Sequence, residues 1–129
     1  MLRAYRDGDE QKIELTDEGK VFYNKEEDYY KYHMKNDETY TCIDSKGKVC
    51  GVMCFSWVGD ITYKAWILFD KVRGYKCLRD FKKLVDLYKK NGYIGYTISP
   101  ISEKQSKMHR FFNCEADEIQ GDMQVWVTY

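Results

Sequence analysis

The sequence lacks an excess of charge of one sign, a long hydrophobic run and an N-terminal leader. Lys and Arg number 21, as do Asp and Glu, so no long-range field favours nucleic acid or an anionic membrane as a partner. The longest apolar runs, such as Ala65–Phe69, fall far short of the roughly 20 residues that span a membrane. No basic segment followed by an apolar one opens the chain. We therefore expect a cytoplasmic protein with no membrane partner and no indication of a nucleic-acid partner.

Motifs for metal binding or redox chemistry are also missing. The five cysteines are odd in number and include no Cys-x-x-Cys pair, the spacing typical of zinc ribbons and redox centres. We interpret them as reduced, buried thiols, because free cysteine is among the most buried residue types. Cys42, Cys50 and Cys54 share parity and would face one side of a hairpin. Metal binding therefore stays open as an alternative, although no histidine lies nearby in the sequence.

Apolar and aromatic residues, in contrast, are plentiful. Hydrophobic residues make up 43% of the 129 and aromatic residues 16%, with 12 Tyr and 3 Trp. This supplies enough surface for burial to offset the entropy of ordering the chain. A second core would have too little apolar surface to close at this length. We expect a single domain over residues 1–129.

The first third of the chain is predicted to form a strand and two helices. Leu2–Tyr5 alternates weakly, and the turn signal Asp7–Asp9 is followed by apolar residues at short helical spacing up to Leu15. Asn24 then precedes acidic residues in a capping-box-like start. A second helix is predicted over about Lys25–Lys35, with its tyrosines, histidine and methionine on one face.

The middle of the chain predicts a three-stranded antiparallel meander. Thr39–Asp44 and Val49–Trp57 flank a turn in which Gly47 supplies the positive φ angle. In Ile61–Phe69, residues of the two faces alternate, and the segment becomes apolar on both faces near its end, which is typical of a central strand. We expect these strands to pack against a helix over about Cys77–Lys90, whose apolar residues repeat at three and four positions.

The last third predicts a strand, a short helix and a hairpin. Tyr93–Ser99 is the strand, and Pro100 ends it by removing a hydrogen-bond donor. A capping box at Ser102–Gln105 begins the helix. The two strands of the closing hairpin, Cys114–Gln120 and Met123–Tyr129, flank a Gly-Asp turn.

This order of elements resembles that of the GNAT superfamily of N-acyltransferases over nearly the whole chain. The resemblance is sharpest in Ile61–Gly92, where a central strand runs through Val72–Tyr75 into an amphipathic helix, and in Ser102–Asn113, which is similar to the family's last helix. Short acetyltransferase-like proteins of tailed phages are similar in size. The resemblance implies an α/β (α+β) fold with a mixed, mostly antiparallel central sheet flanked by helices.

The resemblance also implies a site for acetyl-CoA. The family splays its fourth and fifth strands apart and aims backbone amides of the following loop at the pyrophosphate, a task suited to a helix N-terminus. Its loop pattern is Gln or Arg, two residues, Gly, one residue, then Gly or Ala. Here Arg73 takes the first place, and Lys76 and Leu78 stand where the small residues belong. The cofactor-binding residues implied are Ile67, Leu68, Phe69, Arg73, Gly74, Tyr75 and Lys76.

Two departures from the family's pattern bear on function. Small residues in the loop let the backbone approach phosphate, so Leu78 argues against ordinary cofactor binding, whereas Lys76 adds a compensating point charge. The family's usual catalytic groups, a Glu on the fourth or neighbouring strand and a Tyr on the last helix, are missing from Ile61–Phe69 and from the last helix. His109 is the proton-transfer residue there and our catalytic candidate, with a surface or half-buried polar role as its alternative.

Two functions fit these observations. The first is an acyl-CoA-dependent N-acyltransferase in which an amine acceptor attacks the thioester. The second is a catalytically inactive phage protein with this fold that acts in the host cytoplasm through a protein partner, as a virion component or an inhibitor of host defence. The tyrosines at positions 29, 30 and 32 suit an acceptor site, a protein contact or the core.

Overall fold

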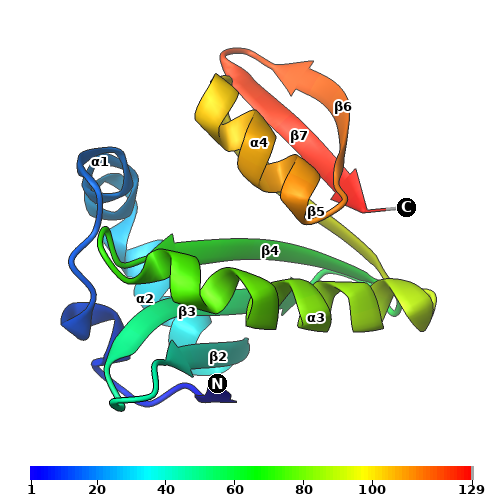
Figure 1. Cartoon of the computed structure of the whole chain (residues 1–129). Helices are drawn as coiled ribbons and strands as arrows, with labels where there is room; N and C mark the ends of the chain where they lie inside the picture. The colour runs from blue at the N-terminus through cyan, green and yellow to red at the C-terminus, as the bar shows by residue number, and fades with distance from the viewer. Residues whose placement is uncertain (129) are drawn as a thin grey trace. The chain divides into compact units, whose positions relative to one another are not determined.

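The structure is a computed structural model that describes residues 1–128, and Figure 1 shows its elements in chain order. Over these residues it contains seven β-strands, four α-helices and two short 3-10 helices. The strands are β1 (Leu2–Ala4), β2 (Glu38–Ile43), β3 (Val49–Trp57), β4 (Thr62–Phe69), β5 (Ile94–Pro100), β6 (Glu115–Gln120) and β7 (Met123–Thr128). The helices are η1 (Asp9–Lys12), α1 (Asp17–Lys25), α2 (Glu27–Asn36), η2 (Gly74–Cys77), α3 (Leu78–Lys90) and α4 (Glu103–Phe111).

The sheet is mixed and mostly antiparallel, which confirms the predicted fold class. Its strand order is β1-β2-β3-β4-β5-β7-β6, so β4 takes the central place, as predicted. The pairs β1–β2, β2–β3, β5–β7 and β6–β7 are antiparallel. The parallel ladder of β4 with β5 comprises three residue pairs, Thr62–Lys64 with Ile94–Tyr96.

The chain divides into two compact units, and we describe each by itself. Unit 1 consists of Met1–Ser56 and Trp66–Phe81, and unit 2 of Trp57–Ala65 and Lys82–Tyr129. Of unit 2, the last position, Tyr129, lies outside the described residues. The expectation of a single domain remains a prediction. In the part of the chain that the structure describes, no helix is long and apolar enough to cross a membrane.

The core of unit 1 forms around apolar residues from several elements. Its buried members are Ile13, Met34, Val49, Val52 and Leu68. Close packing at one point of β3 requires a glycine there, because a Cβ atom at Gly51 would lie 2.8 Å from Cys77 Sγ and 3.1 Å from the Leu68 carbonyl oxygen. Burial of these side chains is the main stabilising term for the unit.

The N-terminal helices differ from the prediction. The structure has α1 over Asp17–Lys25, where no helix was predicted, and α2 begins only at Glu27. Thr16 begins α1 as its N-cap, because its hydroxyl accepts a hydrogen bond from the Gly19 amide over 3.1 Å. The helix predicted over about Lys25–Lys35 was therefore wrong at its start, since Asn24 and Lys25 lie inside α1.

The predicted meander is confirmed. Residues of β2 pair with β3 in antiparallel register, with Cys42 opposite Gly51. At one end of the β3–β4 pair the Val58 amide donates to the Thr62 carbonyl, and at the other end the Asp70 amide donates to the Cys50 carbonyl. The residue numbers of the paired positions thus rise along one strand as they fall along the other, which means that the strands are antiparallel.

Unit 2 packs through aromatic side chains. Four of them form an edge-to-face cluster with ring centroids 5.0 to 5.8 Å apart: Trp57, Tyr63, Tyr88 and Tyr93. Aromatic pairs prefer this arrangement because the ring edge is electropositive and the ring face is electronegative. A Cβ atom at Gly95 would lie 2.4 Å from the Tyr63 ring, so that position must be glycine.

The ends of the C-terminal elements follow the predicted signals. The Ser102 hydroxyl accepts from the Gln105 amide over 3.1 Å at the start of α4, as the capping box predicts. Gly121 has a φ of 64° in the turn between β6 and β7, a conformation that glycine adopts without strain. Both signals are local, which is why the sequence predicted them correctly.

Candidate functional site

The residues predicted to bind the cofactor form one continuous segment of unit 1, from the end of β4 into η2. Leu68 is buried in the core, whereas Ile67 and Phe69 are half-buried. Gly74 is buried against Phe69, because a Cβ atom there would lie 2.9 Å from the Phe69 Cβ. Glycine at this position therefore serves the close packing of the loop on β4.

Asp70, which directly follows β4, organises the loop. Asp70 is 4% exposed. Its carboxylate accepts hydrogen bonds from the amides of Val72 (3.0 Å), Arg73 (2.8 Å) and Glu14 (3.0 Å). The Gly74 amide donates to the Asp70 carbonyl oxygen over 2.8 Å. The amides at the start of the helical run are therefore already engaged.

Ionised Asp70 stabilises this loop. Burial by itself raises the pKa of the carboxyl, but the hydrogen bonds from the three amides and the charge of Arg73 outweigh it and hold the pKa below its usual range. The negative charge thus occupies the position, near helix-start amides, that suits an anion. Sequence reasoning missed Asp70. Its bonds to the Val72 and Arg73 amides are local, as in an Asx turn, whereas its bond to the Glu14 amide joins residues far apart in the chain.

Two cations of the loop remain partly exposed. Arg73 Nη2 lies 3.5 Å from Asp70 Oδ1, with the side chain 31% exposed. Lys76 Nζ lies 3.7 Å from Asp44 Oδ2, with its side chain 41% exposed. Tyr75 between them is 69% exposed. Both ion pairs are long, and each cation has further N–H donors for a second anion while it stays beside its buried carboxylate.

The chemistry of this donor set fits a phosphate group through side chains rather than through the backbone. The amides of Val72, Arg73 and Gly74 have partners within the loop. The guanidinium of Arg73 and the ammonium of Lys76 can instead contact phosphate oxygens as charge-assisted donors. Leu78, where the family pattern has Gly or Ala, is half-buried at the first position of α3.

His109 belongs to unit 2, whereas the seven cofactor residues belong to unit 1. The imidazole is 6% exposed and stacks on Trp126, with centroids 4.9 Å apart and planes 8° apart. Its Nδ1 lies 2.6 Å from the Gln105 carbonyl oxygen, so Nδ1 carries the proton and Nε2 the lone pair. Burial lowers the pKa of His109, although the Gln105 bond opposes this. These contacts are those of a packed, neutral histidine, and its catalytic role remains a prediction.

The cysteines are free and mostly buried, as predicted. Cys42, Cys50, Cys54 and Cys77 are buried, and Cys114 is half-buried. Burial raises the pKa of Cys54 and of Cys114 to about 11, so both are thiols at neutral pH. Within residues 1–128, no group of three His, Cys, Asp or Glu side chains could hold a metal ion.

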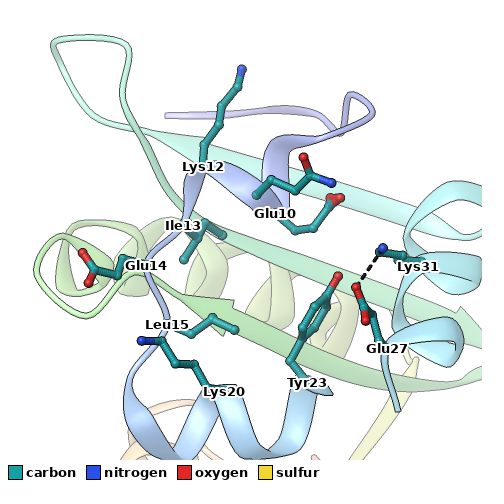
Figure 2. Close-up of a pocket in the computed structure, with 10 residues that line it drawn as sticks. Glu10, Lys12, Ile13, Glu14, Leu15, Lys20, Tyr23, Glu27 and Lys31 are labelled. Carbon is teal, nitrogen blue, oxygen red and sulfur yellow. Dashed lines mark ion pairs between the residues drawn. The ribbon is translucent and has the colours of Figure 1, made fainter. Parts of the chain in front are cut away.

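A pocket of about 420 Å³ in unit 1 was not predicted from the sequence. Figure 2 shows it between the η1 segment, α1 and α2. Its floor includes Ile13, Leu15 and Tyr23, and charged side chains surround the floor. Because α1 was not predicted, nothing in the sequence pattern placed Lys20 or Tyr23 beside the segment of Ile13.

Comparisons with known proteins concern the whole chain. No protein-family model and no curated relative matches the sequence. Among solved structures, an acetyltransferase from Bacillus subtilis in complex with CoA matches with a TM-score of 0.73 and 11% identity, covering 99% of this chain and 95% of that one. A GNAT-family acetyltransferase from Bacillus anthracis matches with a TM-score of 0.71 and 10% identity, covering 98% and 92%.

A third solved structure is a chimeric spermidine N-acetyltransferase from Vibrio cholerae. It matches with a TM-score of 0.70 and 14% identity, and the match covers 99% of this chain and 93% of that one. At these identities the likeness shows the fold. The sequence folds into the mixed sheet and helices of GNAT acetyltransferases, as its element order predicts.

Proposed function

From this fold we propose that the protein is an acyl-CoA-dependent N-acyltransferase with an amine acceptor. The observation that carries the proposal is the continuous segment from β4 into η2, which bears two partly exposed cations in a fold that matches acetyltransferases over the full chain. One of those matches is described as a complex with CoA. Acetyl-CoA is accordingly the cofactor we expect.

The cofactor end of the site would be built from unit 1. When bound, acetyl-CoA would supply a thioester carbonyl that an amine attacks. Ile67–Phe69 are the last residues of β4, and the backbone groups of a strand suit hydrogen bonds to an extended chain. Arg73 and Lys76 would hold phosphate, and the exposed Tyr75 ring offers a stacking face.

Proton transfer in this proposal is assigned to His109. Its lowered pKa keeps the imidazole neutral near pH 7, and with Nδ1 bonded to Gln105 the lone pair of Nε2 can accept a proton from an amine. The stacking on Trp126 fixes the plane of the ring. A purely structural role for this residue would leave acyl transfer intact when it is replaced.

The second candidate is a non-enzymatic protein that keeps the fold and acts through a protein partner, as a virion component or an inhibitor of host defence. The observation that favours it is the loop itself, in which Asp70 engages the amides that would otherwise face a phosphate. Leu78 in place of a small residue adds to this. Neither feature affects a protein-binding surface elsewhere.

An acetyl-transfer assay separates the two. Purified protein is incubated with acetyl-CoA and a mixture of primary amines, and acetylated amine and free CoA are measured by mass spectrometry. We expect both products in equal amounts, with a loss of transfer in His109→Gln. If wild-type protein releases no CoA at millimolar acetyl-CoA and its melting temperature does not change, the enzyme proposal is wrong, since ligand at 100 times its dissociation constant adds about 2.7 kcal/mol.

A further inference from the structure

A histidine of α2 in unit 1 belongs to a hydrogen-bonded cluster that the proposed function does not use. His33 Nδ1 pairs with Asp37 Oδ2, four residues further along the chain. The Ser56 hydroxyl donates to the same oxygen over 2.6 Å and lies 3.4 Å from His33 Nδ1. Because an ionised carboxylate only accepts hydrogen bonds, Nδ1 carries the proton of the imidazole and Nε2 carries the lone pair.

The cluster differs from a catalytic triad with a serine nucleophile. In such a triad the serine hydroxyl lies on Nε2 of the histidine, while the carboxylate holds Nδ1–H. Here Asp37 and Ser56 both lie on the Nδ1 side of the ring. They therefore orient the imidazole of His33 and leave Nε2 as its reactive atom.

Nε2 of His33 is open to a ligand. Within residues 1–128 it has no hydrogen-bond partner, and the side chain is 23% exposed. The Tyr29 ring lies beside the imidazole, with centroids 4.3 Å apart, and the Tyr32 ring lies 5.2 Å from it. The lone pair can accept an N–H from an alkylammonium group, and the rings can contact its carbon chain.

Helix α2 places His33 near the segment proposed to bind acetyl-CoA. The Cys54 thiol of β3 donates to the His33 carbonyl over 3.5 Å. Tyr30, three positions earlier on the same helix, packs edge-to-face on Trp66 of β4, with ring centroids 4.8 Å apart. Trp66 directly precedes Ile67, the first residue of that segment. The histidine and the segment thus lie in the same unit and are joined by one helix.

Acyl transfer to an alkylamine requires two proton transfers, and the proposed function accounts for one of them. The pKa of an alkylammonium is about 10.4, as in lysine, so the acceptor arrives protonated at neutral pH. It must lose one proton before its nitrogen can attack the thioester. A second proton leaves the nitrogen as the C–N bond forms and the C–S bond breaks, and it ends on the thiol of CoA. The first proton needs an acceptor of its own.

We propose, on the basis of the proposed function, that His33 Nε2 takes this first proton from the ammonium of the acceptor and passes it to water. Asp37 is a positioning residue, because it holds Nδ1–H and its charge stabilises the imidazolium that forms. The acceptor is then a primary alkylamine whose carbon chain contacts the rings of Tyr29 and Tyr32.

Two amines of similar size separate this role from a structural one. Ethylamine is protonated at pH 7, whereas the nitrogen of trifluoroethylamine is largely unprotonated and needs no base before attack. Acetyl transfer to each is measured with wild-type protein, His33→Gln and Lys35→Gln, an exposed control on the same helix. We expect His33→Gln to lose about 100-fold for ethylamine, the scale of general-base catalysis, and to keep its transfer to trifluoroethylamine. Asp37→Asn should show the same selectivity, because an amide can donate to Nδ1 and favour the other tautomer.

The outcomes of this assay are distinct. The inference is overturned if His33→Gln acetylates ethylamine as Lys35→Gln does, or if it loses both amines equally, as a structural role predicts. Transfer to neither amine by wild-type protein overturns the proposed function, and this inference with it.

Chemical modification tests the wild-type protein without a substitution. Diethyl pyrocarbonate acylates neutral imidazole nitrogen, and hydroxylamine reverses the reaction. We expect peptide mapping to find His33 modified and the buried His109 unmodified, with a reversible loss of transfer to ethylamine alone. An unmodified His33, or full transfer by the modified protein, would contradict the inference even if His33→Gln did not fold. Melting temperatures verify folding of each variant.

Discussion

The two units of the chain differ in the ionisable groups that they bury. Among the described residues, the buried carboxylates Asp9 and Asp70 both lie in unit 1, with 0% and 4% exposure. Asp9 accepts hydrogen bonds from Arg3, the Arg6 amide and the Thr41 hydroxyl. Unit 2 instead buries a neutral histidine on a tryptophan and the Tyr63 ring, which packs in a cluster with three less buried aromatic rings.

This difference indicates how strongly the stability of each unit should depend on pH and salt. A buried carboxylate that is ionised must be hydrogen-bonded or paired to be tolerated, so it fixes a loop precisely but makes stability depend on pH. Aromatic packing depends little on pH or salt. The loops that carry candidate ligand groups lie in unit 1, which has these buried carboxylates beside its apolar core.

The largest expected effect is in unit 2. Trp126→Ala should lower the free energy of unfolding by about 3–5 kcal/mol, because it empties a buried site, removes the stacking partner of His109 and leaves the Ser99 hydroxyl without its donor. Urea denaturation measures this. Phe111→Ala, at a side chain that is 40% exposed, should cost less than about 1 kcal/mol. Equal losses for the two variants would contradict the aromatic account of unit 2.

The matching change in unit 1 is Asp9→Ala. It removes a bidentate partner of Arg3 and should cost about 3 kcal/mol at pH 7. Burial raises the pKa of Asp9, but the bonds from Arg3, the Arg6 amide and Thr41 lower it further, to about 2. The folded pKa is below the unfolded value, so this stabilisation is present above the unfolded pKa and is lost as the pH falls towards 2.

The control is Asp7→Asn at an exposed position, which should change stability little. Unfolding is measured from pH 7 to pH 2.5. Wild-type protein should lose stability below about pH 4 more steeply than Asp9→Ala does. Parallel curves for the two proteins would show that Asp9 does not carry the acid sensitivity.

The smallest effect concerns His109. The pKa of His109 is lowered in the folded state. Below the unfolded value of about 6.5, the unfolded state therefore takes up the proton first, and the free energy of unfolding falls as the pH falls. His109→Gln should remove this slope below about pH 6.5 while leaving the acid slope of Asp9 in place. Thermal denaturation across this range tests it. An unchanged slope in the variant would mean that the pKa of His109 is the same in the folded and unfolded states.

Local signals in the sequence accounted for most of the fold. Helix α3 and the turns at Gly47 and Gly121 were predicted because periodicity and positive-φ glycines act over a few residues. Helix α1 was missed, since Gly19 interrupts its propensity and its start depends on the Thr16 cap.

The candidate site was less predictable. The segment of Arg73 and Lys76 followed from a resemblance, but the bond that joins its loop to the Glu14 amide spans 56 positions. The pocket at Glu10 and Lys20 likewise needs three elements brought together. Such groupings come from tertiary structure and leave no periodic signal in the chain.

Calorimetric titration of CoA tests most directly the claim that loop cations, rather than loop amides, hold the cofactor. We expect wild-type protein to bind CoA weakly, with a dissociation constant on the order of 0.1–1 mM. The double variant Arg73→Gln, Lys76→Gln should bind at least about tenfold more weakly, because charge-assisted bonds to phosphate are lost. Lys104→Gln in α4 of unit 2 should bind as wild type does. No heat of binding with wild-type protein at millimolar CoA, or equal binding by the double variant, would contradict the account.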